Sequence, residues 1–451
     1  MSSLRSHAAA AASRVASHTR RSRLARAAVV AGATTVVVAA TAVGAGAIVV
    51  PATPTAPAVS FFPSINYAQA HPVSCTTDCS KMTFHAGGTV QHGEADYLIF
   101  WIPKGYYMPP TYRSGLSTWL SDVAAGNYTP GNVFSVAQQY YDLTGPGGAK
   151  SFVPYAVTNA GSFVDTSALP ASGCTDSATP VCINDTQIRA EVQKVVTAHH
   201  LPQNENTEYI LFTPFNVGSC FSSASTSCAY TAYCGYHSFF AGTTGQIVYA
   251  NMPWSYNVNG CDVNLAFGTG FPNVSAIDTE VGVFSHELIE TMTDPNLNAW
   301  FDGSGNEIGD KCAYNYNGTT YGSMTGLANN GFGFWNQLLG GDEYLLQTEF
   351  SNFNAKSSTT GCVGKDGDKQ PTVTISTVPS PPVHGSSTQF TANITAPNGV
   401  STVDWTFGDG GSATGNPVNH TYASAGNKTV TVIVTDGHGN EKKLVQTISV
   451  S

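Results

Sequence analysis

Apolar and polar positions divide the chain into a long mixed α/β region and a shorter all-β region. Between residues 84 and 362, short apolar runs typical of buried strands alternate with stretches whose apolar residues recur at helical spacing. From 371 to 451, period-two alternation between turns predicts a β-sandwich. The strands expected in the first region are 95–102, 208–212, 245–250 and 343–350, and the helices are 112–125, 133–141, 185–199 and one that begins at Asp278 or Thr279 and stops before Pro295.

These patterns and the composition of the intervening segments predict five parts. They are an export signal at 1–50, a Pro/Ala-rich and loosely packed lead-in at 51–83, an α/β (α+β) domain at 84–362, a polar linker at 363–370 and the all-β domain at 371–451.

The helix before Pro295 carries the main candidate chemistry. Its residues His286-Glu287-Leu288-Ile289-Glu290 are a variant of the zinc-peptidase motif H-E-x-x-H, with Glu in place of the second His. Residues four apart share a helix face, so His286 and Glu290 can ligate one metal ion while Glu287 acts as general base. Carboxylates near a helix C-terminus oppose the macrodipole, and a divalent cation would reverse that cost. The alternative is a surface helix with a chance match to the motif.

A third metal ligand is expected downstream of this helix. Residues 299–310 are typical of a strand, a Gly-rich turn and a second strand, which would bring Glu307 and Asp310 back toward the helix. The sequence leaves open which of the two binds the ion. A Cys/Ser-rich loop is expected from 217, and it holds His237. This residue could reach the metal or polarise a substrate carbonyl, although a hydrogen-bonded structural His in such a loop is the commoner case.

Charge and cysteine content place the protein outside the cytosol. The first 50 residues hold six arginines and no acids and end in an uncharged Ala/Val/Gly/Thr run, which is typical of a cleaved export signal; a retained anchor is the alternative. Without them, 13 basic residues face 29 acidic ones, a net charge of −16 that argues against nucleic acid or an anionic membrane as partner. Ten cysteines between 75 and 362 indicate a disulfide framework, and nearest-neighbour pairing would give the bridges 75–79, 174–182, 220–228, 234–261 and 312–362.

The C-terminal region resembles the PKD domain. The matching residues are Trp405-Thr406-Phe407-Gly408-Asp409-Gly410, then His420-Thr421-Tyr422, then Gly426 to Val432, with Lys428 where the family has an aromatic residue. This resemblance implies an immunoglobulin-like β-sandwich that serves as an accessory module on secreted hydrolases and surface proteins, without catalysis of its own.

The region 84–362 is similar to secreted bacterial and fungal proteins that carry H-E-x-x-E, T-D-P, A-W-Y-D and G-x-E-I-G-D-x-C in this order. Here these motifs are 286–290, 293–295, Ala299-Trp300-Phe301-Asp302 and 305–312. Cys234-Gly235-Tyr236-His237-Ser238 and the Thr-Asp-Pro turn also resemble the plant phosphate-induced (Exordium) family. Because the equivalent helix of that family lacks H-E-x-x-E, the second resemblance implies fold and secretion rather than peptidase activity.

Together these observations predict a secreted, monomeric, zinc-dependent hydrolase, a metallopeptidase with a disulfide-stapled, zincin-like domain. One His and two carboxylates would also suit a harder ion such as manganese or calcium. The partner expected is a protein or peptide substrate. The rival hypothesis is a non-catalytic extracellular protein that binds a cell-wall or matrix polymer and uses the acidic cluster structurally. A glycosidase based on Glu287 and a second carboxylate has no specific support in the sequence.

Overall fold

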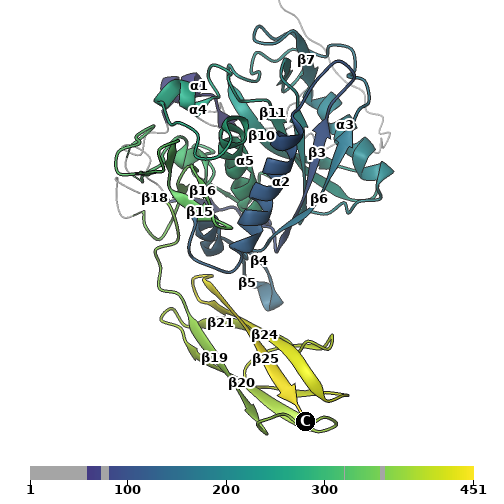
Figure 1. Cartoon of the computed structure of the whole chain (residues 1–451), viewed down its shortest axis with the longest axis vertical. Coiled ribbons are helices and arrows are strands. Elements are labelled where there is room, and N and C mark those ends of the chain that lie inside the picture. The colour runs from purple at the N-terminus through teal and green to yellow at the C-terminus, as the bar shows by residue number, and fades with distance from the viewer. Residues whose placement is uncertain (1–57, 73–80, 319, 356–360) are drawn as a thin grey trace, which may run out of the picture. The chain divides into compact units, whose positions relative to one another are not determined.

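The computed structural model describes residues 58–72, 81–318, 320–355 and 361–451 (Figure 1). The export signal expected at 1–50 and the bridge expected between Cys75 and Cys79 therefore lie outside the described residues. In the described segments, no helix combines the length and the apolar character needed to cross a membrane.

A six-stranded mixed sheet forms the centre of the α/β domain. Three neighbouring pairs in it, β11/β8, β8/β3 and β3/β6, are parallel, whereas β1 and β11 each run antiparallel to β10. Such a mixture is common where an edge hairpin or strand extends a parallel sheet. In spatial order the strands are β1 (Ser60–Pro63), β10 (Tyr233–Ala241), β11 (Gln246–Pro253), β8 (Thr207–Thr213), β3 (Glu94–Trp101) and β6 (Val157–Asp165).

Helices cover both faces of this sheet. Neighbouring residues of β10 identify the two sides, because successive side chains of a strand point to opposite faces. The phenol of Tyr236 donates a 2.8 Å hydrogen bond to Asp185 in α3 (Asp185–Ala198), whereas a Cβ atom added to Gly235 would lie 2.6 Å from Val283 in α5 (Ser275–Thr293). On the α5 side, α2 (Pro110–Ala125) packs against α5 through Trp119 and Phe284, whose ring centroids are 4.6 Å apart. The helices expected at 112–125 and 185–199 are thus confirmed.

Helix α5 begins and ends for different reasons. It ends at Thr293 because Asp294 precedes a proline, as predicted. The expected start at Asp278 or Thr279 is wrong: the helix begins at Ser275, after an N-cap Val274 whose side chain donates and accepts nothing. The carboxylate of Asp278 instead accepts hydrogen bonds from the backbone and side-chain nitrogens of Asn273 at 2.7 and 3.0 Å.

Three segments differ from their expected form. Residues 58–70, expected to be a loosely packed lead-in, form β1 and α1 (Ile65–Ala70), and all four residues of β1 are buried. The segment 133–141, expected to be an α-helix, contains the 3₁₀ helix η1 (Val133–Gln139) and the start of β4. The second strand expected within 299–310 is absent from the described structure there; β12 (Trp300–Phe301) pairs with β2 (Thr83–Phe84), and Asp310 opens the 3₁₀ helix η3 (Asp310–Cys312).

The remaining elements of this domain are short. The helical ones are α4 (Val263–Phe267) and the 3₁₀ turn η2 (Pro146–Gly148). The two-stranded ribbons pair β4 (Tyr141–Gly145) with β5 (Ala149–Phe152), β7 (Val181–Asn184) with β9 (Val217–Cys220), β13 (Ala328–Asn329) with β14 (Phe334–Trp335), β15 (Gln337–Leu339) with β16 (Asp342–Tyr344), and β17 (Glu349–Phe350) with β18 (Cys362–Val363). The continuous strand expected at 343–350 is therefore split between β16 and β17.

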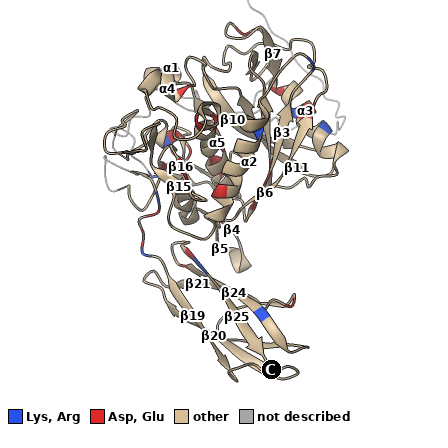
Figure 2. Ribbon diagram, viewed as in Figure 1, with Lys and Arg blue, Asp and Glu red and all other residues tan. Residues whose placement is uncertain are grey.

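The C-terminal region forms a separate two-sheet sandwich with its own hydrophobic core. One sheet holds three strands and the other four, and the buried residues between them include Phe390, Trp405, Phe407 and Tyr422. Charged residues are sparse throughout the chain, and most of the ribbon in Figure 2 is tan. In spatial order the sheets are β19 (Thr372–Val378), β20 (Ser387–Thr395) and β23 (Val418–Thr421), and β22 (Ser412–Thr414), β21 (Val400–Thr406), β24 (Gly426–Asp436) and β25 (Glu441–Val450).

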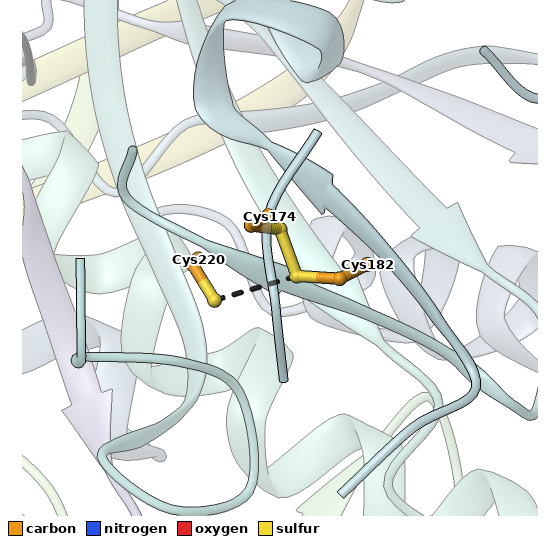
Figure 3. A group of neighbouring side chains, drawn as sticks. All are labelled: Cys174, Cys182 and Cys220. Atoms are coloured by element: carbon orange, nitrogen blue, oxygen red, sulfur yellow. Dashed lines mark hydrogen bonds between the residues drawn. A yellow bond between two sulfur atoms is a disulfide. The ribbon is translucent and has the colours of Figure 1, made fainter. Parts of the chain in front are cut away.

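Four disulfides join described residues of the α/β domain. They are 174–182, 220–228, 234–261 and 312–362, which confirms four of the five nearest-neighbour pairs. The bridges 174–182 and 220–228 lie side by side, with 3.4 Å between the sulfurs of Cys182 and Cys220 (Figure 3). Because Cys174, Cys182 and Cys220 are all oxidised, this sulfur cluster offers no thiolate to a metal ion.

Candidate functional site

Helix α5 brings the motif residues into the interior instead of onto the surface. Most of its side chains are buried, so the alternative that it is a surface helix is wrong. His286, Glu287 and Glu290 are each fully buried. A buried carboxylate needs a partner of opposite charge, a hydrogen-bond donor or a proton, so these residues must be matched by their surroundings.

His286, Glu290 and Asp310 converge on one point. The Nε2 atom of His286 lies 3.1 Å from Oε1 of Glu290 and 3.5 Å from Oδ1 of Asp310. The first pair is one helical turn apart, as the spacing predicts, and the third member comes from η3 downstream. One ligand atom of each residue lies within 4.8 Å of the others.

The downstream segment approaches the helix closely enough to require a glycine. A Cβ atom on Gly309 would lie 2.7 Å from Nδ1 of His286, so any larger residue would push Asp310 away. The backbone N–H of Asp310 donates a 2.9 Å hydrogen bond to Glu290. The turn before it is organised by Asp302, which accepts hydrogen bonds from Asn306 and pairs with Lys311 at 2.6 Å. This turn, instead of the expected hairpin, places Asp310.

His237 and Glu287 form a second contact next to the first. Nδ1 of His237, on β10, lies 3.1 Å from Oε2 of Glu287 and 3.7 Å from Oε2 of Glu290. Its Nε2 lies 3.7 Å from Glu307. The structure therefore places Asp310 beside His286 and Glu307 beside His237, and Glu290 contacts both histidines.

The N-terminal strand closes the site. The backbone N–H of Phe62 donates a 2.8 Å hydrogen bond to Oε1 of Glu287, and the hydroxyl of Ser60 donates one of 3.3 Å to Glu290. The ring of Phe62 packs on His286 at 4.6 Å between centroids. On another side, the amide of Gln347 lies 3.0 Å from Nδ1 of His286.

Burial and crowding of charge set the protonation of the site. Burial, together with the nearby Asp294 and Glu290, raises the pKa of Glu307 well above its usual range, and burial and Glu290 raise that of Asp310 to about 8. Burial also disfavours the charged form of His286, but Glu290 and Asp310 outweigh it and raise the pKa of the ring. In Glu290, burial is outweighed by His286 and the pKa is lowered. Without a cation, these acids share protons instead of ionising together.

The residues present fit a divalent cation. Both oxygens of Glu307, Oδ1 of Asp310 and the Nε2 atoms of His237 and His286 are buried without a hydrogen-bond partner. Ligands about 2.1 Å from a tetrahedral zinc ion lie about 3.4 Å from one another, and the His286–Glu290 and His286–Asp310 separations bracket that value. Imidazole nitrogen and carboxylate oxygen are both donors that zinc accepts.

A second group of buried acidic residues lies on the central sheet, next to α5. Glu94 and Asp96 share one face of β3, and Asp96 is paired in register with Glu208 on β8. The hydroxyl of Thr291, next to Glu290, donates a 2.9 Å hydrogen bond to Glu208. Burial first, and then mutual repulsion, raises the pKa of Glu94 and of Glu208 well above the usual range.

The sequence alone indicates some of these residues and not others. His286, Glu287, Glu290, Glu307 and Asp310 all lie within the buried cluster. His237 was considered but left out of the metal set, and the structure places it in contact with Glu287. Ser60, Phe62 and Gln347 were not considered. Residues 343–350 were expected only to form a strand, whereas Gln347 lies against the site. One signal could have indicated Ser60–Pro63, the apolar run Val59 to Phe62 before a proline.

Comparisons with known proteins concern mainly the C-terminal sandwich. The PKD domain family matches residues 368–451. The PKD1 domain of Vibrio anguillarum Epp is 22% identical over 19% of this chain and 96% of that one, with a TM-score of 0.17. A structure described for carbohydrate-binding modules of the β-sandwich superfamily is 28% identical over 19% of this chain, at a TM-score of 0.18, and the match spans only 36% of that chain.

One alignment covers more of the chain at lower identity. OgpA from Akkermansia muciniphila aligns with 83% of this chain and 98% of its own, at 10% identity and a TM-score of 0.21, a similarity too low to support an argument. No curated protein matches the chain. The disulfides and the sandwich indicate an extracellular protein. The family match and the two-sheet core together show that residues 368–451 form a PKD domain.

Proposed function

We propose that the α/β domain is a secreted metal-dependent hydrolase, specifically a zinc peptidase with zincin-like chemistry. The observation that carries the proposal is the convergence of His286, Glu290 and Asp310, with one ligand atom from each within 4.8 Å of the others. Glu287 follows His286 directly on the same helix, in the position of a general base. The acidic composition and the export signal expected at 1–50 support a secreted protein that binds neither nucleic acid nor an anionic membrane. The substrate proposed is protein or peptide, and the enzyme is proposed to act as a monomer.

In this proposal His286, Glu290 and Asp310 hold the cation. Glu307 lies beside His237 and is not a ligand. When bound, a divalent ion supplies Lewis acidity that polarises a carbonyl and makes water more acidic. Glu287 accepts the proton of the attacking water and passes it to the leaving nitrogen. His237 hydrogen-bonds Glu287 and so fixes the orientation of its carboxylate. Burial of His237 and Glu287 strengthens the hydrogen bond between them.

Metal analysis of the full chain tests this proposal. Mass spectrometry of the purified protein should find about one zinc ion per chain, and His286→Ala should lose it. Glu287→Gln should keep the metal, because Glu287 is not assigned as a ligand. No bound zinc, manganese or calcium in the unmutated chain would contradict the proposal.

One observation favours the rival hypothesis of a non-catalytic, polymer-binding extracellular protein. Ser60 and Phe62 donate hydrogen bonds to Glu290 and Glu287, as expected if these two carboxylates belong to a structural core. Under that hypothesis the acidic cluster only stabilises the fold, and Glu287→Gln would change no function. The two hypotheses therefore differ in the expected effect of Glu287→Gln, which is loss of hydrolysis under the first and no change of function under the second.

A further inference from the structure

The strand β1 lies where an extended peptide would bind. It adds antiparallel to the outer edge of β10, in the register Ser60 to His237, Phe61 to Tyr236 and Phe62 to Gly235. Addition of a strand to an exposed sheet edge is a general way of binding extended peptides, because the backbone supplies the affinity and alternate side chains supply the specificity. Here Ser60 of the added strand is paired in register with His237.

The alternate side chains of β1 have separate roles. Ser60 and Phe62 point toward α5, where they contact Glu290 and His286. Phe61 points to the opposite face and packs on Tyr233 and Phe221. Phe62 also lies 4.7 Å from the ring of Tyr314, whose hydroxyl donates a 2.7 Å hydrogen bond to the carbonyl of Pro63. The strand thus places one aromatic side chain beside the candidate metal ligands.

With β1 in place, solvent does not reach the candidate ligands. His286, Glu290, Glu307 and Asp310 are all fully buried, and so is Glu287. A peptide can reach Glu287 only if β1 leaves, and the Phe62 N–H then releases the carboxylate oxygen that it occupies.

We propose that residues 58–70 are an intramolecular plug that occupies the binding position of an extended peptide substrate along β10. This inference rests on the proposed hydrolase function, which it deepens by naming the substrate class. The substrate is a peptide in β conformation with an aromatic or large apolar side chain in the position of Phe62. The plug does not place a carbonyl against Glu287, because the group that it presents there is the Phe62 N–H.

The plug is held by a few specific contacts that can be changed. Beyond the strand, the N–H of Ser64 donates to Ala232, the N–H of Ile65 donates to Gly260, and Ser238 donates to the carbonyl of Ala58. Withdrawal of β1 would leave the outer edge of β10 unpaired, and an unpaired edge readily accepts another strand.

The test uses the full chain with a recognition site for a specific protease inserted between Pro72 and Lys81. The matched control carries the same insertion within the linker 365–370, so that cutting leaves the plug attached. After cutting, each protein is incubated with a fluorescent peptide of residues 58–70, and binding is followed by anisotropy. We expect about one peptide to exchange into the plug-cut chain, and none into the uncut chain or the linker-cut control.

Peptide variants show whether binding follows the proposed contacts. Phe62→Ala should weaken peptide binding about tenfold or more, because the aromatic anchor is lost. Gln69→Ala, at an exposed position of α1, should bind like the original peptide. These variants lie in the added peptide, so they leave the folding of the cut protein unchanged.

Hydrolysis of a peptide library and metal content are measured on the same samples, so that the two proposals can fail separately. Hydrolysis that appears on plug cutting and is inhibited by the 58–70 peptide would support both. Peptide exchange with no bound metal and no hydrolysis would overturn the hydrolase and retain the strand-binding edge. Full hydrolysis by the uncut chain, or no peptide exchange after cutting, would overturn the plug and leave the hydrolase proposal intact.

Discussion

The backbone N–H of Phe62 donates a 2.8 Å hydrogen bond to Oε1 of Glu287. The donor belongs to a strand near the N-terminal end of the described chain, and the acceptor belongs to the buried helix α5, 225 residues later. The other carboxylate oxygen of Glu287 faces His237 at 3.1 Å. The residue proposed as general base is therefore fully engaged while β1 is in place, so its function must be measured after the plug is cut.

Glu287→Gln should abolish hydrolysis by the plug-cut protein and leave metal content unchanged. General-base catalysis contributes about 10²–10⁴-fold, and a neutral amide cannot accept the proton. The amide oxygen can still accept the Phe62 N–H, so the fold should persist. Initial rates on a peptide substrate and zinc content together check this prediction.

Glu280→Gln is the matched control for that experiment. It makes the same change at another buried position of α5, where Glu280 accepts a hydrogen bond from the N–H of Ser255. We expect its hydrolysis rate to equal that of the unmutated protein. Equal loss of activity in both variants would mean that any carboxylate lost from α5 damages the site, and would contradict a specific role for Glu287.

Asp310→Asn should weaken metal binding more than Glu307→Gln does. Asp310 lies 3.5 Å from the His286 ring nitrogen that faces Glu290, whereas Glu307 lies beside His237. Loss of an outer partner typically costs about 10–100-fold in metal affinity, and loss of a ligand should exceed that. Competition with a chelating dye measures both affinities. A larger loss in Glu307→Gln would assign the third ligand to Glu307.

The disulfide 312–362 should stabilise both the fold and the metal site. It closes a separation of 50 residues and directly follows Asp310 and Lys311. In the chain-entropy model such a loop contributes about 4 kcal/mol, against about 2.5 kcal/mol for the eight-residue separation of 174–182. Replacing both cysteines of 312–362 by serine should lower Tm and metal affinity together. The same replacement at 174–182 should lower Tm less and leave metal affinity unchanged.

Local sequence signals were sufficient for the end of α5 and for the placement of the motif on it, but not for its start. The spacing of His286 and Glu290 dictates a shared helix face, and Asp294 before proline dictates the helix end. The position of Asp310 depends on a turn held by Asp302 and on the close approach of Gly309 to His286. These are tertiary contacts, so the sequence alone left two candidates, Glu307 and Asp310, for the third metal ligand.

The strands that complete the site carry weak sequence signals. The first six residues of β10, Tyr233 to Ser238, are all buried, so they show no alternation of apolar and polar residues, and the Cys, Gly and Ser among them are typical of a loop. His237 was therefore placed in a loop. Strand β1 has only four residues and ends in Pro63, where the pairing register shifts. Proline at such an edge position is compatible with a strand, but the Pro/Ala-rich composition around it is typical of a linker.

Glu280 should make the protein less stable as pH rises. Burial is the main cause that raises the pKa of this carboxyl from 4.5 to about 8, although the Ser255 N–H opposes the shift. Its titratable neighbours, the phenols of Tyr112 and Tyr230, themselves have raised pKa values through burial and stay neutral in this range. Below pH 4.5 the carboxyl is protonated in both the folded and the unfolded chain. Between pH 4.5 and about 8 the unfolded chain has lost this proton and the folded chain retains it, so folding becomes less favourable.

Glu280→Gln removes this proton linkage and keeps an acceptor for the Ser255 N–H. Since each pKa unit is worth about 1.4 kcal/mol, the variant should gain stability over the unmutated protein by several kcal/mol between about pH 5 and about pH 8. Urea unfolding of both proteins at these two pH values measures the difference. Parallel loss of stability in the two proteins would mean that Glu280 is already ionised in the folded state at neutral pH and that other buried acids, such as Glu94, Asp96 and Glu208, set the pH dependence.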